Sequence, residues 1–152
     1  MKRRPRIYLD TSVISAIFDS RNRERAFLTR LFWQQRVQYQ VFVSDLVLTE
    51  IRRTSASKLR RQMEELIARL ALARITNDVE SLAKDYISHG AIPDEYPEDA
   101  YHIAIAVINE MDFLLSWNFR HIVRQRTREI VKMVNGRHGL RHVEILTPAE
   151  LL

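Results

Sequence analysis

Short apolar runs alternate along the chain with longer segments in which apolar residues recur at helical spacing. The short runs predict strands at residues 7–9, 40–43, 113–116 and 143–146. The longer patterns predict helices at residues 13–18, 45–53, 56–72 and 77–88, and two more that begin at Pro97 and Phe119. Strands that alternate with helices favour an α/β fold, here a three-layer α/β/α sandwich with a mainly parallel central sheet.

The chain is predicted to form a single domain over residues 1–152. Its length is typical of one domain, and 46% apolar residues supply one sizeable core. No internal repeat, low-complexity segment or linker divides it. The only charged leader, at the N-terminus, is followed by just three apolar residues before Asp10, so we expect neither a signal peptide nor a membrane span.

The composition limits the partners and the reactive groups that the protein can use. There are 24 Lys and Arg residues against 19 Asp and Glu residues, a net charge of +5 that favours a polyanionic partner such as RNA. Cys is absent, which excludes disulfides and thiol chemistry and is compatible with the reducing cytoplasm, where we expect the protein. With only three Gly residues, the chain has no glycine-rich phosphate loop of the P-loop or Rossmann kind.

Three acidic residues stand where parallel strands would bring catalytic groups together. Asp10 follows the first strand directly, although the same position suits an ordinary helix N-cap. Glu50 falls inside the apolar arc of its helix, between Leu46 and Ile51, where an ionised carboxylate needs a cation, hydrogen bonds or a metal. A position on a solvated flank of the helix is the alternative for Glu50.

Asp99 lies in the first turn of the helix that begins near Pro97, at the border of its apolar face. The helix dipole favours an acid there whatever its function. Glu98 is a weaker alternative ligand because it falls on another part of the helix surface, and His102, one turn along, is interpreted as a supporting or structural residue.

Asn118 follows the strand at residues 113–116 as Asp10 follows the first strand, and a helix cap is again the alternative. Three carboxylates that converge at the strand ends would repel one another unless a divalent cation compensates their charge. Oxygen ligands suit Mg²⁺ or Mn²⁺, which can acidify water and neutralise charge on a phosphodiester. We therefore expect Asp10, Glu50, Asp99 and Asn118 to form one catalytic site.

Four stretches resemble, in order, the acidic motifs of PIN domains: residues 8–14 (YLDTSVI), 44–51 (SDLVLTEI), 98–104 (EDAYHIA) and 114–119 (LLSWNF). The resemblance implies an α/β/α sandwich and Mg²⁺- or Mn²⁺-dependent cleavage of RNA. Asp10, Glu50 and Asp99 match the metal ligands, and Ser12 matches the hydroxyl that orients the first acid. At the fourth motif many members carry an acid where this chain has Asn118, which leaves the binding of a second metal ion open.

The same resemblance suggests a VapC-like toxin, a kind of ribonuclease that is often a homodimer and is inhibited by an antitoxin protein. Met63, Leu66, Ile67 and Leu70 form an apolar stripe that is either core or a groove for a partner. A solitary RNA-processing nuclease and a non-catalytic RNA-binding module with a decayed site are the alternatives. A receiver domain and a haloacid-type phosphatase also place Asp after a first strand. This chain lacks the neighbouring acid pair expected of a receiver domain, and it has Ser12 where the phosphatase would have a second Asp.

Basic residues dominate the C-terminal part of the chain, with Glu129 as the opposing acid among them. We expect Arg120, Arg124, Arg128 and Lys132, together with Arg126, Arg137 and Arg141, to contribute to RNA binding through phosphates. The alternative is a solvated helix face that keeps the protein soluble.

Overall fold

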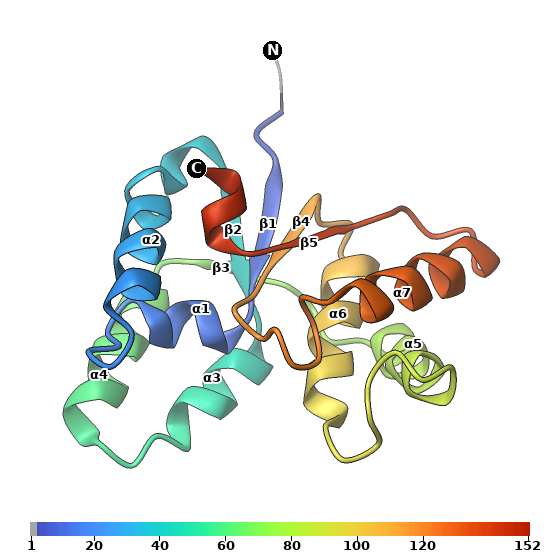
Figure 1. Cartoon of the computed structure of the whole chain (residues 1–152), viewed down its shortest axis with the longest axis horizontal. Helices are drawn as coiled ribbons and strands as arrows, with labels where there is room; N and C mark the ends of the chain where they lie inside the picture. Colours follow the sequence, from blue (N-terminus) through green and yellow to red (C-terminus); the bar gives the residue numbers. More distant parts are fainter. Residues whose placement is uncertain (1–2) are drawn as a thin grey trace.

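The computed structural model describes residues 3–152 as a three-layer α/β/α sandwich around an all-parallel sheet (Figure 1). The strands are β1 (Arg6–Leu9), β2 (Gln40–Val43), β3 (Ala71–Leu72), β4 (Phe113–Leu115) and β5 (Glu144–Leu146), in the spatial order β3-β2-β1-β4-β5. The helices are α1 (Thr11–Ala16), α2 (Arg23–Gln34), α3 (Asp45–Arg52), α4 (Ser57–Ile67), α5 (Asn77–Ser88), α6 (Pro97–Ile108) and α7 (Gln125–Arg137), with short 3-10 turns at Arg36–Gln38 and Pro148–Leu151. The predicted fold class is confirmed.

The chain changes direction across the sheet at β1. From β1 it moves outward to β2 and β3 on one side, and it then returns to add β4 and β5 on the other side. Figure 1 shows the helices before β3 gathered on one face of the sheet and α5, α6 and α7 on the opposite face. Because the strand order reverses between β1 and β4, their carboxyl ends border the crevice where open parallel sheets place their ligands.

The central strand β1 is buried on both faces, as is typical of a parallel sheet. Ile7, Tyr8 and Leu9 of β1 are fully buried, and Tyr8 pairs in register with Phe42 of β2 and Leu114 of β4. The first strand is therefore the centre of the core, and its last residue delivers Asp10 to the sheet edge.

Two of the predicted element boundaries were wrong. Ala71 and Leu72 form β3 beside Phe42 and Val43 rather than the end of a helix, since the apolar periodicity of α4 runs on by chance into a strand too short to be recognised. Residues 119–124 form turns instead of the start of a helix, and α7 begins at Gln125.

The apolar stripe of α4 is part of the core. Met63 and Ile67 are buried, and Leu66 and Leu70 are half-buried and packed against the same cluster. Of the two interpretations of the stripe, the one as part of the core is therefore right, and the one as a free groove for a partner protein is wrong. Over residues 3–152, no helix is long and apolar enough to cross a membrane.

The turn after β4 is fixed to α2 by a buried hydrogen bond. The indole N–H of Trp117 donates to the hydroxyl of Thr29 (2.8 Å), which in turn donates to the carbonyl of Arg25 (2.6 Å). Thr29 is fully buried, so this bond is shielded from water.

Thr29→Val should lower the free energy of unfolding by about 1–3 kcal/mol, because it leaves the buried indole N–H of Trp117 without its acceptor. Urea unfolding at neutral pH measures this difference. Thr49→Val is the matched control, since Thr49 is an exposed helical residue of α3. Equal losses of stability in the two variants would contradict the role given to Thr29.

Candidate active site

Asp10 lies at the carboxyl end of β1 and is 3% exposed. Its Oδ1 accepts hydrogen bonds from the Ser12 hydroxyl (2.5 Å) and the Val13 amide (3.3 Å), and its Oδ2 accepts one from the Ser116 hydroxyl (2.5 Å). Burial raises the pKa of Asp10, while the charge of His102 and these hydrogen bonds oppose the rise. Asp10 is thus an N-cap of α1 and also a buried acid held between two strands.

The two serines join the ends of β1 and β4 through Asp10. The Ser12 hydroxyl accepts a hydrogen bond from the Trp117 amide (2.8 Å), and the Ser116 hydroxyl accepts one from the Asn118 amide (2.9 Å). The structure therefore places Ser12 on the Asp10 carboxylate, as the sequence suggested, and adds Ser116 as a second donor.

Glu50 projects from α3 toward the same edge of the sheet. Its Oε1 accepts a hydrogen bond from the Thr11 hydroxyl (2.8 Å) and contacts Nε2 of His102 at 2.5 Å. Burial works to raise the pKa of Glu50, but the hydrogen bond and charge of His102, together with the hydrogen bond from Thr11, outweigh it and lower the pKa. Glu50 and His102 consequently form a buried ion pair.

His102 is the buried partner of Glu50 and also contacts the central strand. It is 2% exposed, and its Nδ1 lies 2.8 Å from the Tyr8 hydroxyl, which in turn lies 2.8 Å from the Ser44 hydroxyl. Burial works to lower the pKa of His102, but the hydrogen bond and charge of Glu50 and the charges of Asp10 and Asp99 raise it above its usual value. All three predicted ligands thus exert their charge on this one imidazole.

Asp99 lies in the first turn of α6, and its Oδ2 contacts Nδ1 of His121 at 2.9 Å. The backbone amide of His121 donates to Oδ1 of Asn118 (2.9 Å), so Asn118 caps the turn after β4. The ring of Tyr96 stacks on His121 with a centroid distance of 4.3 Å. Asp99 and Asn118 are therefore joined through His121.

An open cavity of about 510 Å³ lies over this edge of the sheet. It is lined by Glu50, Glu95, Tyr96, Pro97, Glu98, Asp99, Asn118, Arg120 and His121. Asp10 is buried and does not line the cavity. Glu98 pairs with Arg53 at 2.7 Å.

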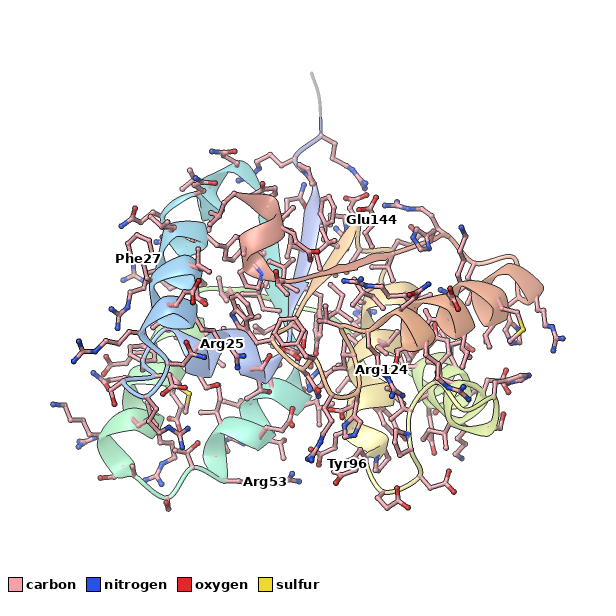
Figure 2. All side chains as sticks on the ribbon, viewed as in Figure 1. Arg25, Phe27, Arg53, Tyr96, Arg124 and Glu144 are labelled. Atoms are coloured by element: carbon pink, nitrogen blue, oxygen red, sulfur yellow. The ribbon has the colours of Figure 1, made fainter. Side chains whose placement is uncertain are left out.

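The predicted RNA-binding residues do not gather on one surface. Arg120 lines the cavity, whereas Arg124 donates to Thr127 and to the carbonyl of Ala91. Arg128 and Lys132 border a second cavity beside β5. Figure 2 shows Arg124 near the middle of the molecule and Glu144 of β5 well above it.

The remaining three basic residues are also dispersed. Arg141 pairs with Asp112, which precedes β4 at the opposite end of the sheet, and Arg137 contacts His89. Arg126 is exposed on α7. These residues therefore make several different contacts, and their part in RNA binding stays a prediction.

The donors at the carboxyl edge suit a hard divalent cation, because Asp10, Glu50 and Asp99 offer carboxylate oxygens from three different elements. Within residues 3–152, no three acidic or histidine side chains are gathered in the tight arrangement of a ready-made metal site. His102 and His121 instead supply the partners of Glu50 and Asp99. The donor chemistry fits such an ion, and the convergence of the three carboxylates on it stays a prediction.

The PIN domain family matches residues 7–121, more than half of the chain. The chain belongs to the PIN domain family. The matched region contains Asp10, Glu50, Asp99 and Asn118 and ends at His121. PIN domains are generally nucleases that act on RNA or other nucleic acid and typically use divalent metal ions, so membership indicates a nuclease in general. No curated protein matches the chain.

Sequence reasoning missed Ser116, His121 and Thr11, and it gave His102 only a supporting role. His102 stands three residues after Asp99 and therefore lies on the same face of the helix, so its position in the sequence already indicated that it lies near the site. Ser116 directly follows β4 as Asp10 directly follows β1, and Leu115 pairs with Leu9, so the approach of Ser116 to Asp10 follows from strand pairing. Nothing in the local sequence pattern distinguishes His121.

Replacing His102 should change how stability depends on pH in metal-free buffer. Native His102 has a raised pKa, so above about pH 6.5 it keeps a proton that the unfolded chain loses. The wild-type free energy of unfolding should thus decline as pH rises, by up to ~1.4 kcal/mol per pH unit from this group. His102→Gln should lack that contribution.

Urea unfolding in EDTA at several pH values measures the two profiles. His142→Gln is the control, since His142 is exposed and makes no side-chain hydrogen bond among residues 3–152, and it should follow the wild type. A His102→Gln profile parallel to the wild type would contradict the ion pair with Glu50.

Proposed function

We propose that this protein is an Mg²⁺- or Mn²⁺-dependent endoribonuclease and that residues 1–152 act as one domain. The observation that supports this is the placement of the acids at the reversal of strand order. Asp10, after β1, is hydrogen-bonded to Ser116, after β4, and Glu50 and Asp99 line one cavity at that edge. Family membership supports nuclease activity in general.

In this proposal, Asp10, Glu50 and Asp99 would hold the cation. A bound divalent ion neutralises charge on a phosphodiester and lowers the pKa of water, which makes hydrolysis of RNA possible near neutral pH. The chain's own contribution is orientation. Ser12 and Ser116 fix both oxygens of Asp10, and Thr11 and His102 fix Glu50.

Asn118 would position water or substrate at the rim of this site. Its side-chain oxygen is directed to the His121 amide, and His121 in turn contacts Asp99. Asn118 therefore links the cavity to one of the proposed ligands without adding a negative charge.

A VapC-like toxin with an antitoxin partner, a homodimer, and a cytoplasmic location stay predictions of the family resemblance. A solitary RNA-processing nuclease would use the same site. A non-catalytic RNA-binding module differs from both in one measurable respect, since it would bind RNA without cutting it.

Asp10→Asn should reduce Mn²⁺-dependent cleavage of a labelled RNA by at least about 100-fold, because a proposed ligand loses its charge. The fold should persist, with a melting temperature in EDTA at or above that of the wild type, since a buried charge is removed.

Asp45→Asn is the control, because Asp45 is an exposed acid of α3, and it should cleave RNA like the wild type. Wild-type cleavage by Asp10→Asn would refute the site. If the wild type cuts no RNA with either metal ion, the catalytic proposal itself fails.

Asn118→Asp should tighten Mn²⁺ binding in the RNA-free protein, because it keeps the acceptor for the His121 amide and adds a negative charge. Titration calorimetry measures this, with Asn77→Asp, an exposed position in the first turn of α5, as the control. Asn118→Ala should slow RNA cleavage without abolishing it. Two tightly bound Mn²⁺ ions in the RNA-free wild type would overturn this account of Asn118.

A further inference from the structure

Two aromatic rings are exposed beside the predicted site residues. Phe119 directly follows Asn118 and is 51% exposed, and Tyr96 directly precedes the helix that carries Asp99 and is 45% exposed. Tyr96 lines the cavity together with Asp99 and Asn118. Tyr96 therefore stands at the mouth of the carboxylate cavity, and Phe119 lies between two residues that line it, Asn118 and Arg120.

Each ring is held on one side by a more buried aromatic partner. Tyr96 lies 4.3 Å from the His121 ring at an angle of 33°, and Phe119 meets the Trp117 ring at 6.1 Å and 61°. Trp117 is itself fixed by its hydrogen bond to Thr29. The exposed rings are consequently pre-ordered, which reduces the entropy lost when a ligand binds to them.

Arg25 provides a cation next to Phe119. Its guanidinium lies 5.1 Å from the centroid of Trp117 and 5.7 Å from that of Phe119. It makes no salt bridge with any Asp or Glu among residues 3–152. A planar guanidinium held by aromatic rings and free of a carboxylate is suited to binding phosphate.

Interleaved aromatic and basic side chains are typical of surfaces that bind single-stranded nucleic acid, where bases stack on rings and phosphates meet cations. The core of a protein interface is instead depleted of charge. Here Arg25 lies beside Phe119, and Arg120 lines the cavity together with Tyr96, which favours RNA over a protein partner.

We propose that Phe119 and Tyr96 each stack an unpaired base of the substrate while Arg25 binds a neighbouring phosphate. This rests on the proposed function, which places the scissile phosphate at the adjacent carboxylates. A duplex keeps its bases stacked inside the helix and cannot present their faces to these rings.

The test is the binding of a fluorescein-labelled oligouridine to the full chain in EDTA, where metal-dependent cleavage is suppressed. Phe119→Leu and Tyr96→Leu should each weaken binding about 5-fold or more, the range found for loss of one stacked base. Phe119→Trp and Tyr96→Phe should retain affinity, because they keep an aromatic face. Arg25→Gln should reduce the salt dependence by roughly one phosphate contact, a log–log slope change of about 0.7.

Phe27→Leu is the matched control. Phe27 is 60% exposed on α2, and Figure 2 shows it on the outer side of that helix, away from Arg25. It should bind oligouridine like the wild type. An RNA duplex of the same length should bind more weakly and should be insensitive to the Leu substitutions.

The stacking proposal would be overturned if both Leu variants bound oligouridine like the wild type, or if they lost as much affinity for the duplex as for oligouridine. It would also fail if the wild type bound no oligouridine. A parallel cleavage assay with Mn²⁺ separates this from the catalytic proposal. If the wild type binds oligouridine through the rings but cuts no RNA, the stacking proposal stands and the catalytic proposal fails. If the protein cuts RNA and binding does not depend on the rings, the catalytic proposal stands and the stacking proposal fails.

Discussion

Buried negative charge at the carboxyl edge of the sheet is the constraint on which the rest of the site depends. Asp10 is almost fully buried, and the charges of Asp10, Glu50 and Asp99 all act on His102. Carboxylates in such surroundings need positive charge or donors, because burial without them costs several kcal/mol. Much of the local sequence meets that need, through the serines on Asp10 and the imidazoles on Glu50 and Asp99.

The fold explains why these groups meet. Parallel strands end at the same edge, and the reversal of strand order at β1 leaves a crevice between the connections on its two sides. Asp10 enters it from β1, Glu50 from α3 and Asp99 from α6. The hydrogen bond between Tyr8 and Ser44 and the one between Tyr8 and His102 join the central strand to this network. A loss of core packing at β1 would therefore disturb the site as well as the fold.

The sequence was sufficient for the fold class and for the positions of Asp10, Glu50 and Asp99 within their elements, because hydrophobic periodicity and strand-end placement are local properties. Leu72 was predicted to lie in a helix because a strand of two residues is too short to show the alternation of apolar and polar residues that marks a strand. The turn at residues 119–124 and the contacts of His121 depend on tertiary packing against Asp99 and Ala91, which no local pattern encodes. For the same reason the dispersion of the C-terminal arginines could not be read from their density along the chain.

Anomalous diffraction from crystals grown with Mn²⁺ tests the central claim most directly, because it locates the ion relative to each side chain. The account predicts a peak at the carboxyl edge of the sheet, with each of Asp10, Glu50 and Asp99 either bound directly to the ion at about 2.0–2.3 Å or hydrogen-bonded to a water that the ion binds. A peak confined to surface acids such as Asp85 or Asp112, or none at this edge at saturating Mn²⁺, would contradict it.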